Sequence, residues 1–136
     1  MHATVTWQHD QQYDGESASG HHLVLDADPA HQAGPSPMEL VLMALCGCTA
    51  VDVVSILHKK RESFRSLTVS ALAEQAEQVP RVFTHIQLTY HVEGDVAAKS
   101  MEDAVALSKN KYCSVSKMLE KAATIDYVIT YGTNPA

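Results

Sequence analysis

The chain has 136 residues and a formal net charge of −6, and residues 1–58 contain neither lysine nor arginine. This charge distribution argues against nucleic acid and against an anionic membrane surface as partners, and it predicts no secretory signal, which needs a basic start. We therefore expect a cytoplasmic protein whose residues 1–136 form a single domain. In a reducing compartment its three cysteines are expected to be free thiols, metal ligands or redox groups rather than structural disulfides.

The first third of the chain predicts two short strands. Residues 2–8 alternate between apolar and polar side chains, which is typical of a half-buried strand, and residues 21–26 form a second apolar stretch. Residues 14–17 and 19–20 are of types that favour turns. We expect a loop to lead from the second strand to a helix.

Residues 36–61 predict one long helix with a well-defined start. Ser36 is a suitable N-cap, Pro37 fits the first helical position, and Glu39 completes an S-x-x-E capping box. Because the helix is apolar on nearly every face, it must be covered on nearly every face. A membrane span is the alternative, but Glu39 and Asp52 fall within any window long enough to cross a bilayer. We therefore expect the rest of the chain to cover part of the helix and a second copy of the chain to cover the remainder.

The rest of the chain predicts a hairpin, two helical segments and a last strand. The expected ranges are strands over 66–78 and 81–93, a helix over 96–109, a connection over 110–113, a short helix over 115–122, a strand over 125–131 and a tail over 132–136. The alternation in the first two ranges predicts an antiparallel pair. The order of elements indicates an α+β domain with an antiparallel sheet on the long helix.

Two of the cysteines lie on the long helix. Cys46 and Cys48 are two residues apart, so they point about 200° apart and cannot form a disulfide with each other while the helix is intact. A buried cysteine is most often a small hydrophobic residue, and packing is therefore the alternative for each of them.

The third cysteine, Cys113, precedes the last helix and has Lys109, Lys111 and Lys117 close in sequence. A thiol at a helix N-terminus beside cations is expected to have a lowered pKa, so on electrostatic grounds Cys113 is the most activated of the three. Cys48 lies beyond the first turn of its helix and needs a tertiary partner to be activated.

The eight histidines do not show a metal-binding pattern. None has the spacing of a helical zinc site, and the chain has no C-x-x-C, no glycine-rich phosphate loop and no dinucleotide fingerprint. We expect neither a metal nor a bound cofactor.

Several motifs together resemble one family. Residues 36–40 read Ser-Pro-Met-Glu-Leu, Cys48 follows Met38 by ten residues, and Cys113 begins a Cys-Ser-Val-Ser segment. These features and the order of elements resemble the OsmC/Ohr family (organic hydroperoxide resistance and osmotically inducible protein C-like). The resemblance covers essentially the whole chain. It is closest to the YhfA-like branch, through residues 15–20, 50–57, 83–86 and 111–115.

The resemblance implies a fold and an activity. The fold would be OsmC-like, with antiparallel sheets around a long buried central helix in an intertwined homodimer. The activity would be the thiol-dependent reduction of organic hydroperoxides, which is a defence against oxidative stress. Cys48 matches the peroxidatic cysteine, which becomes a sulfenic acid, and Cys113 matches the resolving cysteine, which forms a disulfide with it. An external dithiol would then reduce that disulfide. Cys46 matches no catalytic position of the family.

The chain also departs from the family's catalytic pattern. The family pairs its reactive thiol with an arginine from the N-terminal strands and a glutamate near the helix start. Here residues 1–58 lack arginine and Met38 stands at the glutamate position, while the capping box accounts for Glu39. Asp52 lies one turn after Cys48 and is expected to satisfy a backbone or hydroxyl donor. The candidates for a replacement cation from a second chain are Arg61, Arg65, Arg81 and Lys111.

This departure favours an alternative function on the same scaffold. The chain would then be a non-peroxidatic dimer that senses redox state or binds a small apolar ligand in a groove between the long helices.

Overall fold

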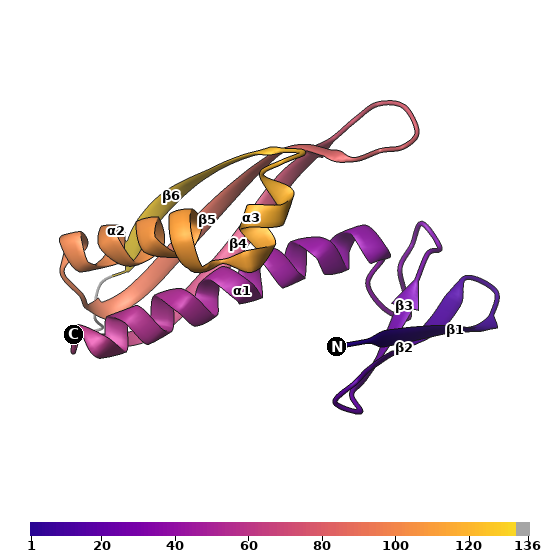
Figure 1. Ribbon diagram of the computed structural model, residues 1–136, viewed down its shortest axis with the longest axis horizontal. Coiled ribbons are helices and arrows are strands. Elements are labelled where there is room, and N and C mark those ends of the chain that lie inside the picture. The colour runs from indigo at the N-terminus through magenta and orange to yellow at the C-terminus, as the bar shows by residue number, and fades with distance from the viewer. Residues whose placement is uncertain (133–136) are drawn as a thin grey trace. The chain divides into compact units, whose positions relative to one another are not determined.

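The computed structural model describes residues 1–132 (Figure 1). The chain forms two compact units, one of residues 1–43 and one from residue 44 onward, and each is described by itself. The single domain therefore stays a prediction. Of the predicted tail, residues 133–136 lie outside the described residues.

The first unit contains a three-stranded antiparallel sheet in the order β1-β2-β3. Its strands are β1 (Ala3–His9), β2 (Gln12–Ser17) and β3 (His22–Asp26). The prediction of a turn at residues 14–17 is wrong, because these residues belong to the central strand β2. Gly15 lies opposite both Val5 and Leu23, and pairing on both sides outweighs the turn preference of the residues themselves.

The loop after β3 is held by one buried carboxylate. Asp26 accepts hydrogen bonds from the backbone N–H groups of Asp28 at 2.9 Å and Ala33 at 3.0 Å. These bonds, that from Ala33 first, hold the pKa of Asp26 below its usual value. The carboxylate thus fixes the path of the chain toward the long helix.

The predicted capping box is confirmed. The backbone N–H of Ser36 donates to Glu39 Oε1 at 2.9 Å, and the N–H of Glu39 donates to Ser36 Oγ at 3.2 Å. These reciprocal bonds satisfy two backbone donors where α1 (Pro37–Lys59) begins. The helix ends two residues earlier than predicted, and Arg61 has a left-handed φ of 57°.

The burial of α1 is narrower than predicted. Its buried side chains form one stripe at intervals of four residues, made of Leu45, Thr49, Val53 and Leu57. Val51 is 70% exposed on another face. By length and mean hydropathy, 2.3 over its most apolar window, α1 is able to cross a membrane, but the core helix of a soluble protein passes the same test.

The second unit is built on a mixed sheet in the order β4-β5-β6. Its strands are β4 (Ser63–Gln75), β5 (Phe83–Asp95) and β6 (Thr124–Gly132). The predicted antiparallel hairpin of β4 and β5 is confirmed. The expectation that the sheet is antiparallel throughout is wrong, because β6 is parallel to β5. A parallel neighbour requires a crossover connection, which the helical segment between the two strands supplies.

That crossover consists of α2 (Ala98–Leu107), the π-helix η1 (Ser108–Tyr112) and α3 (Ser114–Leu119). With α1, these helices lie against one face of the sheet (Figure 1). The connection predicted over 110–113 is instead mostly a π-helical turn, and the N–H of Cys113 donates to the Ser108 carbonyl at 2.8 Å. Short π-helical turns are rare in proteins, and those that occur are often found at functional sites.

Candidate active site

Cys113 lies at the junction between the π-helical turn and α3. It is fully buried and occupies the N-cap position of α3, where its thiol accepts the backbone N–H of Ser116 at 3.4 Å. The turn of η1 therefore ends with a sulfur atom that points into the core of the second unit.

The structure brings the two predicted site residues together. Cys48 is half-buried on α1, and its side chain lies close enough to Cys113 to raise the pKa of that thiol. Both residues belong to the second unit, and both are free thiols. Two residues 65 positions apart in sequence are thus close together in the fold.

The electrostatic prediction for Cys113 is wrong. Burial is the largest influence and raises the pKa of Cys113; the N–H of Ser116 lowers that pKa, and the contact with Cys48 raises it again. The nearby lysines do not reverse this, since Lys117 pairs with Glu120 at 3.3 Å and Lys111 lies over the Tyr112 ring. The thiol is therefore less acidic than an exposed cysteine.

A buried chain of hydroxyl groups runs beside the thiols. The hydroxyl of Thr49 lies 2.7 Å from that of Tyr90 and 2.7 Å from that of Ser108. Ser108 Oγ in turn donates to Asp52 Oδ2 at 2.8 Å. A carboxylate only accepts, so each hydroxyl has one possible role: Ser108 donates to Asp52, Thr49 donates to Ser108, and Tyr90 donates to Thr49.

The sequence predicted the role of Asp52 at one end of this row of hydrogen bonds, but it did not predict the other three members. Asp52 satisfies a hydroxyl donor, as expected. Tyr90, Thr49 and Ser108 carry no local signal, because the partners are 41, 59 and 56 positions apart along the chain. Burial raises the pKa of Tyr90 to about 12, although its hydrogen bond with Thr49 acts in the opposite direction. Tyr90 is thus a neutral hydrogen-bond donor.

Cys46 is half-buried, and burial raises the pKa of its thiol. Cys46 also contributes to the raised pKa of Tyr90. A packing role for Cys46 stays a prediction.

A pocket of about 420 Å³ opens one turn beyond Cys48. Its walls combine apolar, hydroxyl and charged side chains from α1 and from the end of the crossover, namely Asp52, Ser55, Ile56, Lys59, Lys60, Leu107 and Tyr112. Asp52 belongs both to the pocket and to the hydroxyl chain, and Tyr112 directly precedes Cys113. The pocket is therefore lined by residues of the same two segments that carry Cys48 and Cys113.

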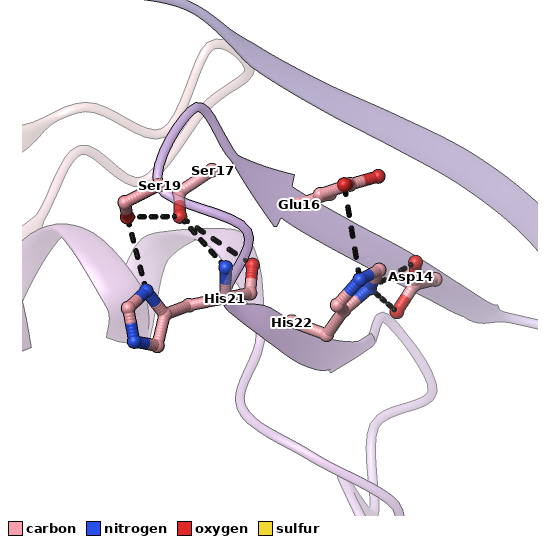
Figure 2. Close-up of polar contacts among 6 residues, drawn as sticks. All are labelled: Asp14, Glu16, Ser17, Ser19, His21 and His22. Atoms are coloured by element: carbon pink, nitrogen blue, oxygen red, sulfur yellow. Dashed lines mark hydrogen bonds and ion pairs between the residues drawn. The ribbon is translucent and has the colours of Figure 1, made fainter.

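The histidines make hydrogen bonds and ion pairs. Figure 2 shows His22 beside two carboxylates, with Nδ1 at 3.0 Å from Asp14 and Nε2 at 3.8 Å from Glu16, while His21 contacts Ser19 at 3.0 Å. Within residues 1–132, no group of three or more histidine, cysteine, aspartate and glutamate side chains is arranged to hold a metal ion.

Three of the four candidate cations have partners of their own within the chain. Arg65 pairs with Glu93 at 3.2 Å, Arg81 donates to the Ala76 carbonyl at 3.1 Å, and the Lys111 amine lies 5.3 Å from the centre of the Tyr112 ring. A replacement cation that stabilises a thiolate at Cys48 stays a prediction.

Comparisons with known proteins agree on the architecture. The family model described as "OsmC-like protein" matches residues 30–128. The chain is 48% identical over 128 residues to Protein YhfA of Escherichia coli K12, covering 93% of this chain and 95% of that protein. A chain solved by structural genomics is 44% identical, with a TM-score of 0.91 and coverage of 98% and 100%. An organic hydroperoxide resistance protein OsmC from Legionella pneumophila is 16% identical, with a TM-score of 0.71 and coverage of 94% of each chain.

Proposed function

Because the chain belongs to the OsmC-like protein family, we propose that it is a thiol-dependent peroxidase that reduces organic hydroperoxides with Cys48 and Cys113. The observation that carries this proposal is the proximity of the two thiols, which come from separate elements and of which Cys48 raises the pKa of Cys113. The name of the Legionella pneumophila protein, whose fold this chain shares, supports the same reaction class.

The proposed reaction has three steps. The Cys48 thiolate attacks one oxygen of the hydroperoxide, the O–O bond breaks, the other oxygen leaves and takes a proton as an alcohol, and Cys48 becomes a sulfenic acid. Cys113 sulfur then attacks the sulfur of the sulfenic acid, so that an S–S bond forms, the S–O bond breaks and water leaves. An external dithiol reduces this disulfide by thiol–disulfide exchange, and no bound cofactor is needed.

The different environments of the two cysteines suit these roles. Cys113 is buried and its pKa is raised, so it stays a thiol while the less buried Cys48 meets the substrate. A reducing cytoplasm, which we propose as the site of action, supplies the dithiol and keeps both thiols free between turnovers.

We propose that the active form is a homodimer. One face of the first sheet carries apolar side chains that are largely exposed, with Val5 at 58% and Trp7 at 62%. The outer face of α1 likewise has an apolar groove at Val51 and Val54. Exposed apolar surfaces of this kind are typical of protein interfaces, and a second copy of the chain is the cover that the long helix requires.

Three single substitutions test the peroxidase proposal. Cys48→Ser is expected to abolish consumption of an organic hydroperoxide, and Cys113→Ser to stop the reaction at a sulfenic acid or a mixed disulfide. Cys46→Ser is the control, because it removes a thiol from the same helix and is expected to keep full turnover. Hydroperoxide consumption by Cys48→Ser at the wild-type rate would overturn the proposal.

A second candidate function rests on the pocket beside the thiols. Its volume of about 420 Å³ is within the range of small-molecule sites, and Ile56, Leu107 and Tyr112 give it an apolar part. With no arginine in residues 1–58, the thiol pair would then sense redox state while the pocket holds a small apolar molecule. Native mass spectrometry tests this: a co-purifying ligand together with absent peroxidase turnover supports it, and an empty protein with rapid turnover excludes it.

A further inference from the structure

We infer that Ser108 is a positioning residue for the closure of the Cys48–Cys113 disulfide. Through its backbone and its side chain, Ser108 holds the turn that carries Cys113 against the helix that carries Cys48. The role of Ser108 in the reaction rests on the proposed function. Its role in holding the two cysteine-bearing segments together rests on geometry alone.

Ser108 contacts both thiol-bearing segments. Its carbonyl oxygen accepts the N–H of Cys113 at 2.8 Å. Its hydroxyl lies 2.7 Å from that of Thr49, the residue that follows Cys48 on α1. One residue therefore connects the backbone of the resolving cysteine to the immediate neighbour of the peroxidatic one.

The hydroxyl of Ser108 has a fixed orientation. It donates to Asp52 at 2.8 Å and accepts from Thr49, which in turn accepts from Tyr90. Ser108 and Tyr90 are 0% exposed and Thr49 is 1% exposed, so water does not compete for the bonds among these three hydroxyl groups, whereas Asp52 is half-buried. In such surroundings a satisfied network of hydrogen bonds rigidifies the structure around it.

The π-helical turn gives this network its importance. The π-helical turn lies between two α-helices, and the Ser108 hydroxyl ties it to α1 at both Thr49 and Asp52. Disulfide formation requires the two sulfur atoms to approach to bonding distance with converging Cβ atoms. A turn released from α1 would satisfy that geometry for a smaller fraction of the time.

The test separates positioning from peroxidase chemistry by two measurements. Equilibration with reduced and oxidised glutathione gives the effective concentration of the thiol pair without any hydroperoxide. Rapid quenching after addition of an organic hydroperoxide, followed by mass spectrometry, gives the rates of Cys48 oxidation and of disulfide closure. The variants are Ser108→Ala, Asp52→Ala and Asp52→Asn, with Ile86→Val as a buried apolar control that is not a member of the hydrogen-bond network.

We expect Ser108→Ala and Asp52→Ala to lower the effective concentration and the closure rate about tenfold, and we expect Ser108→Ala to change the rate of Cys48 oxidation less than about twofold. Asp52→Asn keeps an oxygen that accepts the Ser108 proton, so it is expected to retain closure within about threefold of wild type. Ile86→Val is expected to lower thermal stability and leave closure unchanged.

The inference is overturned if Ser108→Ala and Asp52→Ala both close at the wild-type rate, or if Ile86→Val slows closure as much as they do. If Ser108→Ala does not fold, the comparison of Asp52→Ala with Asp52→Asn decides. If hydroperoxide fails to oxidise wild-type Cys48, the proposed function fails, and the glutathione equilibrium still decides the positioning.

Discussion

At the scale of single residues, the site depends on the unequal environments of two thiols in contact. Cys113 is fully buried and its pKa is raised, whereas Cys48 is only half-buried on its helix. A buried thiol reacts slowly with reagents in solution, but next to a sulfenic acid it attacks within the molecule, where proximity replaces acidity as the source of rate. In the proposed reaction, this arrangement favours resolution by Cys113 over its direct oxidation.

Thr49→Val is expected to lower the free energy of unfolding by about 1–3 kcal/mol. The substitution keeps the shape of the side chain but leaves the Tyr90 hydroxyl without its acceptor and the Ser108 hydroxyl without its donor, both in buried positions. Urea denaturation measures the change. The control is Thr68→Val on the exposed side of β4, which is expected to stay within about 0.5 kcal/mol, and an equal loss in the two variants would refute the account.

His22 is expected to titrate above its ordinary pKa of 6.5. The hydrogen bond to Asp14 is the largest cause, and the charges of Asp14 and Glu16 act in the same direction (Figure 2). Because the folded-state pKa is raised, the stabilisation from this contact is fully present below pH 6.5 and is lost as the pH rises through the folded-state value. NMR titration of the imidazole is the measurement, and Asp14→Asn should return the pKa toward 6.5. An unchanged pKa in that variant would contradict the assignment.

At this scale, the contacts that could be predicted are those between residues close together in the sequence. The capping box joins Ser36 to Glu39 within one turn, so its residue types predict its bonds. The pKa of Cys113 depends on burial by residues from distant parts of the chain. The three lysines near it in sequence predicted a lowered pKa, whereas the pKa is raised. The partners of Thr49 lie 41 and 59 positions away, beyond the reach of any local pattern.

At the scale of elements, periodicity predicted the long regular segments. The α1 helix and the β4–β5 hairpin follow from apolar spacing. The sequence does not reveal β2, because it is short and rich in turn-forming residues and gains its stability from neighbours on both sides. Nor does it reveal the π-helical turn or the parallel pairing of β6, since both depend on how the crossover packs against the sheet.

A pair of glycine substitutions tests how tightly β4 and β5 pair at their bulged end. Gly94 has a φ of 123°, and a Cβ there would lie 2.7 Å from Phe64 Cα. Gly20 has a φ of 85° with nothing within 4 Å of such a Cβ. Gly94→Asn therefore adds a backbone clash to the cost of positive φ, whereas Gly20→Asn has the φ cost alone, which asparagine tolerates well.

We expect Gly94→Asn to cost about 2–4 kcal/mol and Gly20→Asn less than about 1 kcal/mol. Thermal unfolding of the two variants beside the wild type measures the difference. Similar melting temperatures for the two variants would mean that strand pairing at this end of the hairpin relaxes easily.

At the scale of the whole molecule, the main question is what covers the exposed apolar surfaces. The outer face of α1 and one face of the first sheet carry apolar side chains that a single chain leaves exposed, among them Val51, Val5 and Trp7. The capped, almost wholly apolar helix is consistent with a subunit that completes its core on association.

Val51→Asp is expected to shift the protein from dimer to monomer. The side chain is 70% exposed on α1, so the substitution adds no strain within one chain but places a charge in the proposed interface. Size-exclusion chromatography with light scattering gives the mass directly. Leu72→Asp, at a position on β4 that is 74% exposed, is the control and should remain dimeric. A monomeric wild type, or a dimer that Val51→Asp leaves intact, would contradict the proposed interface.

The most direct test of the account is intact and peptide mass spectrometry of the reduced protein after one equivalent of an organic hydroperoxide. The contact between the two thiols predicts a rapid, stoichiometric disulfide between Cys48 and Cys113, with Cys46 remaining free. Free thiols after the addition, or slow oxidation spread over all three cysteines, would contradict the proposed peroxidase reaction.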